Sequence, residues 1–175
     1  MQSDYLFFGG LTAYIAGAAA ALAASGSARL ARVLTCGFAL TGAVLEFWAS
    51  ARAIFTGASP HWEIAARVPF LVYGFQLDTL SALFLLILSL LAGAVSIYSF
   101  GYLHVLEGRR TLGVLGFFFN LLLTSLTAVF TASNAFFFLV AWEVMALSAY
   151  CLVSFEHKNE ETRRAGVLFF SMPVN

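Results

Sequence analysis

Ala-Trp-Glu-Val-Met-Ala-Leu-Ser-Ala-Tyr, residues 141–150, lies inside an apolar stretch that runs from Asn134 to Phe155 and contains one charged side chain, Glu143. About 20 consecutive apolar residues are enough for an α-helix to cross the hydrocarbon core of a bilayer. A carboxylate near the centre of such a helix costs roughly 2.5–3.5 kcal/mol on insertion scales. Chains tolerate that cost where the group faces a bundle interior and has a function. The stretch therefore predicts a membrane helix with Glu143 as its candidate functional residue.

The composition extends this prediction to the whole chain. Of its 175 residues, 61% are hydrophobic, 10% are charged and 19 are Phe. A soluble domain of this size has no use for so much apolar surface, because its exterior must face water. We therefore expect a single polytopic membrane domain over residues 1–175, with the lipid bilayer as a partner. A net charge of zero gives no indication of a nucleic-acid partner.

Hydropathy divides the chain into spans of the length that a bilayer requires. The prediction is an all-α membrane helical bundle with five complete spans and a truncated sixth, which begins near Ala165 and stops at Asn175. No Lys or Arg precedes Arg29, so the first span lacks the basic segment of a signal peptide and is expected to be retained. The five spans are predicted at 5–24, 34–56, 79–103, 113–131 and 135–155.

Basic residues predict the orientation of these spans. If the spans alternate in direction, the loops at 25–33, 104–112 and 156–164 share one side of the membrane and hold seven of the nine Lys and Arg residues. The positive-inside rule then places these loops in the cytoplasm and the N-terminus outside. The connection at 57–77 lies outside, and its segment 68–75, Val-Pro-Phe-Leu-Val-Tyr-Gly-Phe, is predicted to form a short strand or hairpin on the membrane surface.

Three polar residues follow Glu143 along the fifth span and its end. Tyr150 and Ser154 fall at i+7 and i+11, nearly on the same helix face, and His157 comes just after the helix. All four groups can hold or pass protons, so they could form a line from mid-membrane toward the cytoplasm. The alternative is that Tyr150 and Ser154 only pack against neighbouring helices and that His157 is a solvated loop residue.

Two further sets of polar residues lie within the spans. Glu46 is a second mid-span carboxylate, which could meet a partner on another helix or subunit and act in proton transfer. A stripe on the fourth span could line a wet half-channel beside Glu143. Alternatively, its hydroxyls bond their own i−4 carbonyls or a neighbouring helix. The stripe consists of Asn120, Thr124, Thr127 and Thr131.

The sequence indicates no cofactor in this chain and no catalytic or metal site. All three histidines are predicted in loops, so no span offers a haem ligand. No Gly-rich phosphate loop follows a strand. Cys36 and Cys151 fall inside apolar spans without a CxxC or Cys/His cluster and are interpreted as packing residues.

Two segments carry a resemblance to a known family. Phe137-Phe138-Leu139-Val140-Ala141-Trp142-Glu143-Val144-Met145-Ala146-Leu147-Ser148-Ala149-Tyr150, with the loop Glu156-His157-Lys158-Asn159-Glu160-Glu161-Thr162-Arg163-Arg164-Ala165-Gly166, resembles the proton-pumping membrane subunits of complex I and their relatives. Those relatives include Mrp-type cation/proton antiporters and energy-converting hydrogenases. The likeness is strongest to the hydrogenase-4 branch, its component B and the formate hydrogenlyase counterpart. Residues 75–84, Phe-Gln-Leu-Asp-Thr-Leu-Ser-Ala-Leu-Phe, also resemble the start of that family's third helix.

The resemblance implies a proton-translocating subunit in a prokaryotic inner membrane, with redox centres only in partner membrane and peripheral subunits. The family's functional glutamate of the fifth helix matches Glu143, and its partner is a lysine on a seventh helix. This sequence departs from the pattern at Ser171-Met172-Pro173-Val174-Asn175 and stops before that lysine, so we expect an N-terminal fragment of a larger antiporter-like subunit. Two alternatives stay open: a truncated, non-pumping piece that acts only in assembly, and a small cation/proton antiporter component.

Overall fold

The computed structural model describes residues 2–57, 59–65, 72–105 and 112–154. Its helices are α1 (Gln2–Ala23), α2 (Ala28–Thr56), α3 (Thr79–Val105), α4 (Leu112–Thr131) and α5 (Ala135–Ser154). Each of the five is long and apolar enough to cross a membrane, which confirms the all-α, multi-pass prediction. The predicted sixth span and His157 lie outside the described residues.

The second helix begins earlier than predicted. Ser27 caps it, since its side chain accepts a hydrogen bond from the Leu30 backbone N–H at 3.5 Å, and the helix therefore starts at Ala28 rather than near residue 34. Arg29 and Arg32, which were expected in a loop, lie in the first two turns of α2, and that expectation was wrong. At the other end Gly57 adopts φ 63°, a left-handed conformation that suits glycine and ends the helix.

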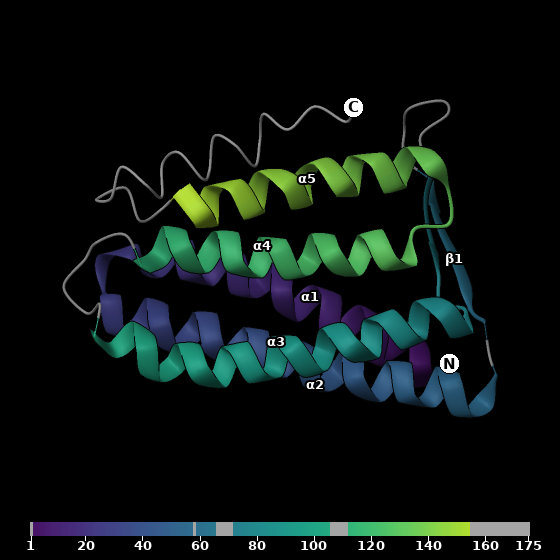
Figure 1. The fold of residues 1–175 in the computed structure, drawn as a ribbon, viewed down its shortest axis with the longest axis horizontal. Helices are drawn as coiled ribbons and strands as arrows, with labels where there is room; N and C mark the ends of the chain where they lie inside the picture. The colour runs from purple at the N-terminus through teal and green to yellow at the C-terminus, as the bar shows by residue number, and fades with distance from the viewer. Residues whose placement is uncertain (1, 58, 66–71, 106–111, 155–175) are drawn as a thin grey trace.

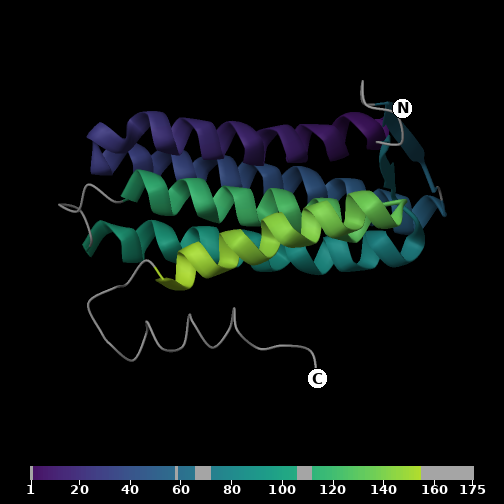
Figure 2. The ribbon, with the colours of Figure 1, turned by 90° about the horizontal axis from the view of Figure 1, so that it is seen from above.

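The helices form an antiparallel bundle in which α1, α2 and α4 contact one another (Figure 1). The fifth helix packs on α4, and the third packs mainly on α2, so α4 lies between α5 and α2 (Figure 1). Seen from above, α5 runs obliquely to α4 (Figure 2). The helix ends that flank the three basic segments all lie at one end of the bundle, as alternating spans require. This arrangement puts the polar face of α4 against α1 and α2.

A β-hairpin covers the opposite end of the bundle (Figure 1). Strand β1 (His61–Ala65) pairs antiparallel with β2 (Val72–Gln76), so that Trp62 lies opposite Phe75. A short strand or hairpin was predicted within 68–75; β2 overlaps that segment, whereas its partner β1 lies before it. The Trp62 ring stacks on Phe7 of α1 at 5.3 Å, and Phe75 meets Phe137 of α5 edge-on at 4.9 Å. These aromatic contacts close that end of the helix bundle.

Small residues line the buried face of α2, while many large apolar residues of α3 face outward. The buried face of α2 carries alanines and Gly42, whereas α3 exposes Leu90, Leu91 and Ile97. This distribution is typical of membrane bundles, because lipid tails are as apolar as leucine and helices gain most from close approach. The buried alanines of α2 are Ala31, Ala39, Ala43, Ala49 and Ala53.

Candidate functional site

The carboxyl group of Glu46 is fully buried where α1, α2 and α4 meet. Its Oε1 accepts a hydrogen bond from the Thr127 hydroxyl of α4 at 2.7 Å, and its Oε2 accepts one from the Tyr14 phenol of α1 at 3.3 Å. Within the described ranges no Lys, Arg or His forms an ion pair with it. The group is thus a buried carboxyl held by hydroxyls alone.

Glycines bring Tyr14 to this position. A Cβ at Gly42 would lie 2.6 Å from Tyr14 Cδ1 and 2.8 Å from Cζ, so the phenol ring lies directly on the α2 backbone there. A Cβ at Gly10 of α1 would lie 2.7 Å from Glu46 Cγ. The close approach of α1 and α2 at these two residues therefore fixes both the ring and the carboxylate.

The polar stripe predicted on α4 is present, and one of its members, Thr127, contacts Glu46. Asn120, Thr127 and Thr131 are buried, whereas Thr124 is half-buried. Each threonine hydroxyl lies within 3.0 Å of its own i−4 carbonyl, as the alternative interpretation expected. Only Thr127 also reaches a titratable side chain.

Asn120 links α4 to α1 and α2, about two helix turns further from the hairpin than Thr127. Its Nδ2 donates to the carbonyls of Gly116 at 3.1 Å and of Thr35 at 3.4 Å, and its Oδ1 faces Gly17 of α1. The Asn120 Oδ1 and the Thr35 hydroxyl are buried side-chain oxygens without a hydrogen-bond partner in the described part of the chain. Buried polar atoms normally have a partner, and an ordered water molecule could serve as one here.

Glu143 lies elsewhere, on the outer surface of α5. The helix buries Phe137, Ala141 and Ser148 against its neighbours, and Glu143 follows Ala141 by two residues, about 200° further round the helix. Its side chain is exposed and makes no hydrogen bond or ion pair with any described residue. The expected bundle interior around Glu143 is not supplied by α1–α4.

The residues predicted in line with Glu143 share its helix. Tyr150 and Ser154 are both half-buried on α5, at i+7 and i+11 from the carboxylate. The two therefore run along the helix toward the end that carries the basic segments, in the order predicted. Their part in proton transfer stays a prediction.

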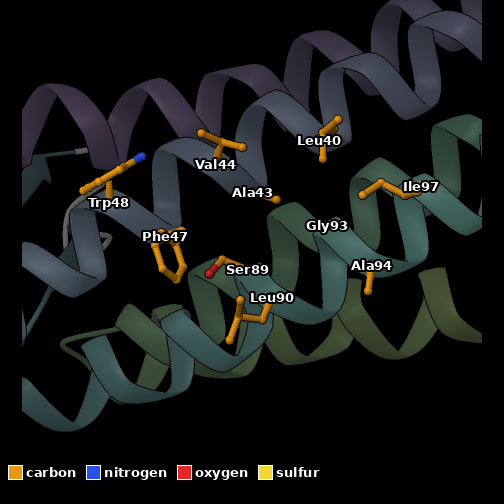
Figure 3. A pocket seen from close by; sticks show the side chains of 10 residues that line it. All are labelled: Leu40, Ala43, Val44, Phe47, Trp48, Ser89, Leu90, Gly93, Ala94 and Ile97. Carbon is orange, nitrogen blue, oxygen red and sulfur yellow. The ribbon is translucent and has the colours of Figure 1, made fainter.

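A hollow on the bundle surface between α2 and α3 carries no titratable group (Figure 3). It is an apolar groove of about 420 Å³ between α2 and α3. Its polar atoms are the Trp48 indole nitrogen and the Ser89 hydroxyl, which donates to the Leu86 carbonyl at 2.7 Å. The groove suits a lipid chain or a helix side chain rather than a reaction.

No group of three or more His, Cys, Asp or Glu side chains that could hold a metal gathers anywhere in the described ranges. Cys36 is buried and Cys151 is half-buried, and both are free thiols. Glu46 and Glu143 are the carboxyls that the described ranges place midway along membrane-spanning helices, and proton exchange at either of them stays a prediction. The sequence analysis missed Tyr14, and the signal available for it was a phenol in the middle of an apolar span.

Comparisons with known proteins identify several relatives of this chain. Residues 70–111 match the model of the family "NADH-Ubiquinone oxidoreductase (complex I), chain 5 N-terminus". Hydrogenase-4 component B of Escherichia coli is 31% identical over 170 residues, which are 97% of this chain and 25% of that protein. NADH-quinone oxidoreductase subunit L of Mycobacterium tuberculosis is 33% identical over 101 residues, 57% of this chain and 15% of that protein.

A protein described as an antiporter subunit of Staphylococcus haemolyticus is 29% identical over 100 residues, 57% of this chain and 12% of that protein. The chain spans about a quarter of the length of component B and less of the other two relatives. The similarity to hydrogenase-4 component B covers 170 of the 175 residues of this chain, so it includes both carboxylates. Hydrogenase-4 component B, subunit L of NADH-quinone oxidoreductase and the antiporter subunit are thus homologues of this chain, and its residues 70–111 match the N-terminal model of complex I chain 5.

Proposed function

We propose that this chain works as part of a larger antiporter-like subunit that translocates protons in a hydrogenase-4-like or NADH:quinone oxidoreductase-like complex. Redox chemistry in partner membrane and peripheral subunits would drive the transport, and this chain would hold no cofactor. The setting we propose is a prokaryotic inner membrane, with the N-terminus outside and the basic end of the bundle in the cytoplasm.

The observation that carries the proposal is the position of Glu143. Its carboxyl lies midway along a membrane-spanning helix and points away from the helices that α5 packs against. Left in lipid, a charged group there would cost roughly 2.5–3.5 kcal/mol or more. A further helix that supplies a cation would remove this cost, so the outer face of α5 is best explained as a contact surface for more protein.

Movement of such a cation would also control whether Glu143 is protonated. An ammonium group at about 4 Å would stabilise the carboxylate by about 4 kcal/mol at an effective dielectric constant of 20. Its approach would expel the Glu143 proton, and its withdrawal would restore the proton. Tyr150 and Ser154 on α5, followed by His157, would pass that proton toward the basic end of the bundle.

The test replaces Glu143 with glutamine in the assembled complex, reconstituted in proteoliposomes with a pH-sensitive dye inside. The variant has the same shape and cannot ionise, so proton pumping should be lost while assembly and electron transfer remain measurable. Glu63→Gln, which changes an exposed carboxylate of the hairpin, is the matched control and should pump normally. Unchanged pumping in Glu143→Gln would refute the role.

The similarity to an antiporter subunit supports a second candidate, cation/proton exchange without a redox partner. The two functions differ in what drives the flux. Proton movement that requires an imposed sodium gradient, and that ignores redox substrates, would favour the antiporter.

A further inference from the structure

Glu46 has the features of a second proton site, separated from Glu143 by α4. Its carboxyl is fully buried, and the groups that touch it are hydroxyls rather than cations. Tyr14 is the titratable side chain that contacts it from α1, and neither α3 nor α4 presents one to it within the described ranges. No contacting cation among the described residues therefore holds the Glu46 carboxyl in its ionised state.

The contacts of Thr127 allow either protonation state of Glu46. The Thr127 Oγ1 lies 2.7 Å from Glu46 Oε1 and 3.0 Å from the Leu123 carbonyl oxygen, and a hydroxyl has a single proton to donate. If Glu46 is ionised, Thr127 donates to the carboxylate. If Glu46 is protonated, its O–H donates to Thr127 Oγ1, and the threonine proton turns to the Leu123 carbonyl.

Tyr14 serves both states without moving. Its phenol donates to Glu46 Oε2, which accepts a hydrogen bond equally as a carboxylate oxygen and as the carbonyl oxygen of the neutral acid. Gain of a proton thus forms one O–H bond at Oε1 and turns one hydroxyl, with no change in the packing of α1, α2 and α4. A site that satisfies every polar atom in both states is suited to exchange.

The two ends of the bundle differ in whether polar groups lie between Glu46 and the solvent. Toward the hairpin, the rings of Phe7, Trp62, Phe75 and Phe137 close the bundle. Toward the basic end, Asn120 lies seven residues before Thr127, about 10 Å along α4. The Asn120 Oδ1 and the Thr35 hydroxyl are buried without a hydrogen-bond partner among the described residues, and water molecules can bond to both.

We propose that Glu46 is a second proton-exchanging carboxyl, with Thr127 as its hydroxyl relay, and that its proton enters and leaves through the Asn120–Thr35 side of the bundle. This inference deepens the proposed function and rests on it for the membrane setting. It adds a proton-holding group on the opposite side of α4 from Glu143.

Infrared difference spectroscopy of the chain in lipid nanodiscs, after a pH jump in H₂O or D₂O, tests the site without any pumping assay. The wild type and Glu143→Gln should show the C=O band of a buried neutral carboxyl, shifted to lower frequency in D₂O. Glu46→Gln should lose it while keeping partners for Tyr14 and Thr127. Tyr14→Phe should raise its frequency, because the carbonyl loses a donor. A band that survives Glu46→Gln, or that never responds to pH or D₂O, overturns the proposal.

Two pairs of variants test the relay and the route. Thr127→Val should slow the rate at which the Glu46 band shifts in D₂O, and Thr127→Ser should restore that rate. Thr124→Val is the control and should leave the rate unchanged, because the Thr124 hydroxyl bonds the Asn120 carbonyl and not Glu46. Asn120→Leu should keep the Glu46 band and slow its exchange, and an unchanged rate would overturn the route. Because the readout is local, failure here leaves the Glu143→Gln pumping result standing, and the reverse also holds.

Discussion

Gly42→Ala is a sharp test of the packing that builds the Glu46 site. The new methyl group would overlap the Tyr14 ring, with Cδ1 at 2.6 Å and Cζ at 2.8 Å, so the ring must move away from Glu46. Overpacking of this kind costs typically 1–3 kcal/mol, and loss of the Tyr14–Glu46 hydrogen bond adds about 1 kcal/mol in a membrane bundle. Alanine returns about 1 kcal/mol through helix propensity. The net expectation is a loss of ~1–3 kcal/mol.

Gly37→Ala is the matched control on the same helix. A Cβ at Gly37 would meet nothing within 4 Å, so this variant should gain up to about 1 kcal/mol. The free energy of unfolding can be measured by titrating SDS into mixed micelles and following the helical circular dichroism signal. Equal stability of the two glycine variants would refute the reasoning. So would a Gly42→Ala penalty that persists in a Tyr14→Ala background, where the ring is absent.

Two further predictions concern the ends of the helices. Asp78 caps α3, since its Oδ1 accepts from the Ser81 backbone N–H at 2.7 Å, and this bond holds the pKa of Asp78 below its usual range. Asp78→Ala should cost about 1 kcal/mol. The wild type's advantage should be present above the unfolded-state pKa and shrink as pH falls through the lowered folded-state pKa; a pH-independent difference in denaturation midpoint would contradict this cause. Trp62→Ala should cost about 2–3 kcal/mol, less than for a fully buried Trp, because it removes the stack on Phe7 from a half-buried site. Trp48→Ala, at a ring that is 60% exposed, is its control in the same SDS titration, and equal losses would count against a structural role for the hairpin.

The membrane helices were predictable because a bilayer restricts what a chain can do. Backbone groups in hydrocarbon must be hydrogen-bonded within the segment, so an apolar run of about 20 residues has almost no alternative to a helix. The predicted spans accordingly match α1, α3, α4 and α5 to within three residues at each end. The larger error, at the start of α2, came from reading two arginines as loop residues where Ser27 begins a helix.

The candidate site was predictable only in part. Thr124 and Thr127 have the same residue type, helix and i−4 hydrogen bond, yet only Thr127 touches Glu46. Helical periodicity places both threonines on one stripe, and the packing of α4 against α2 decides which of them contacts Glu46. Glu46 and Glu143 were both visible as mid-span carboxylates, with Glu143 favoured as the interior one.

The sequence by itself determined the depth of each polar residue in the membrane, because depth follows from hydropathy along a single helix. Only the tertiary structure decided which neighbours each residue meets, because rotation about a helix axis is set by packing against other helices. Tyr14 and Glu46 are 32 residues apart in the chain and Glu46 and Thr127 are 81 apart, and no local pattern links them. The small residues of α1 and α2 let these three helices approach closely, and this contact makes Glu46 the buried carboxyl while Glu143 faces outward.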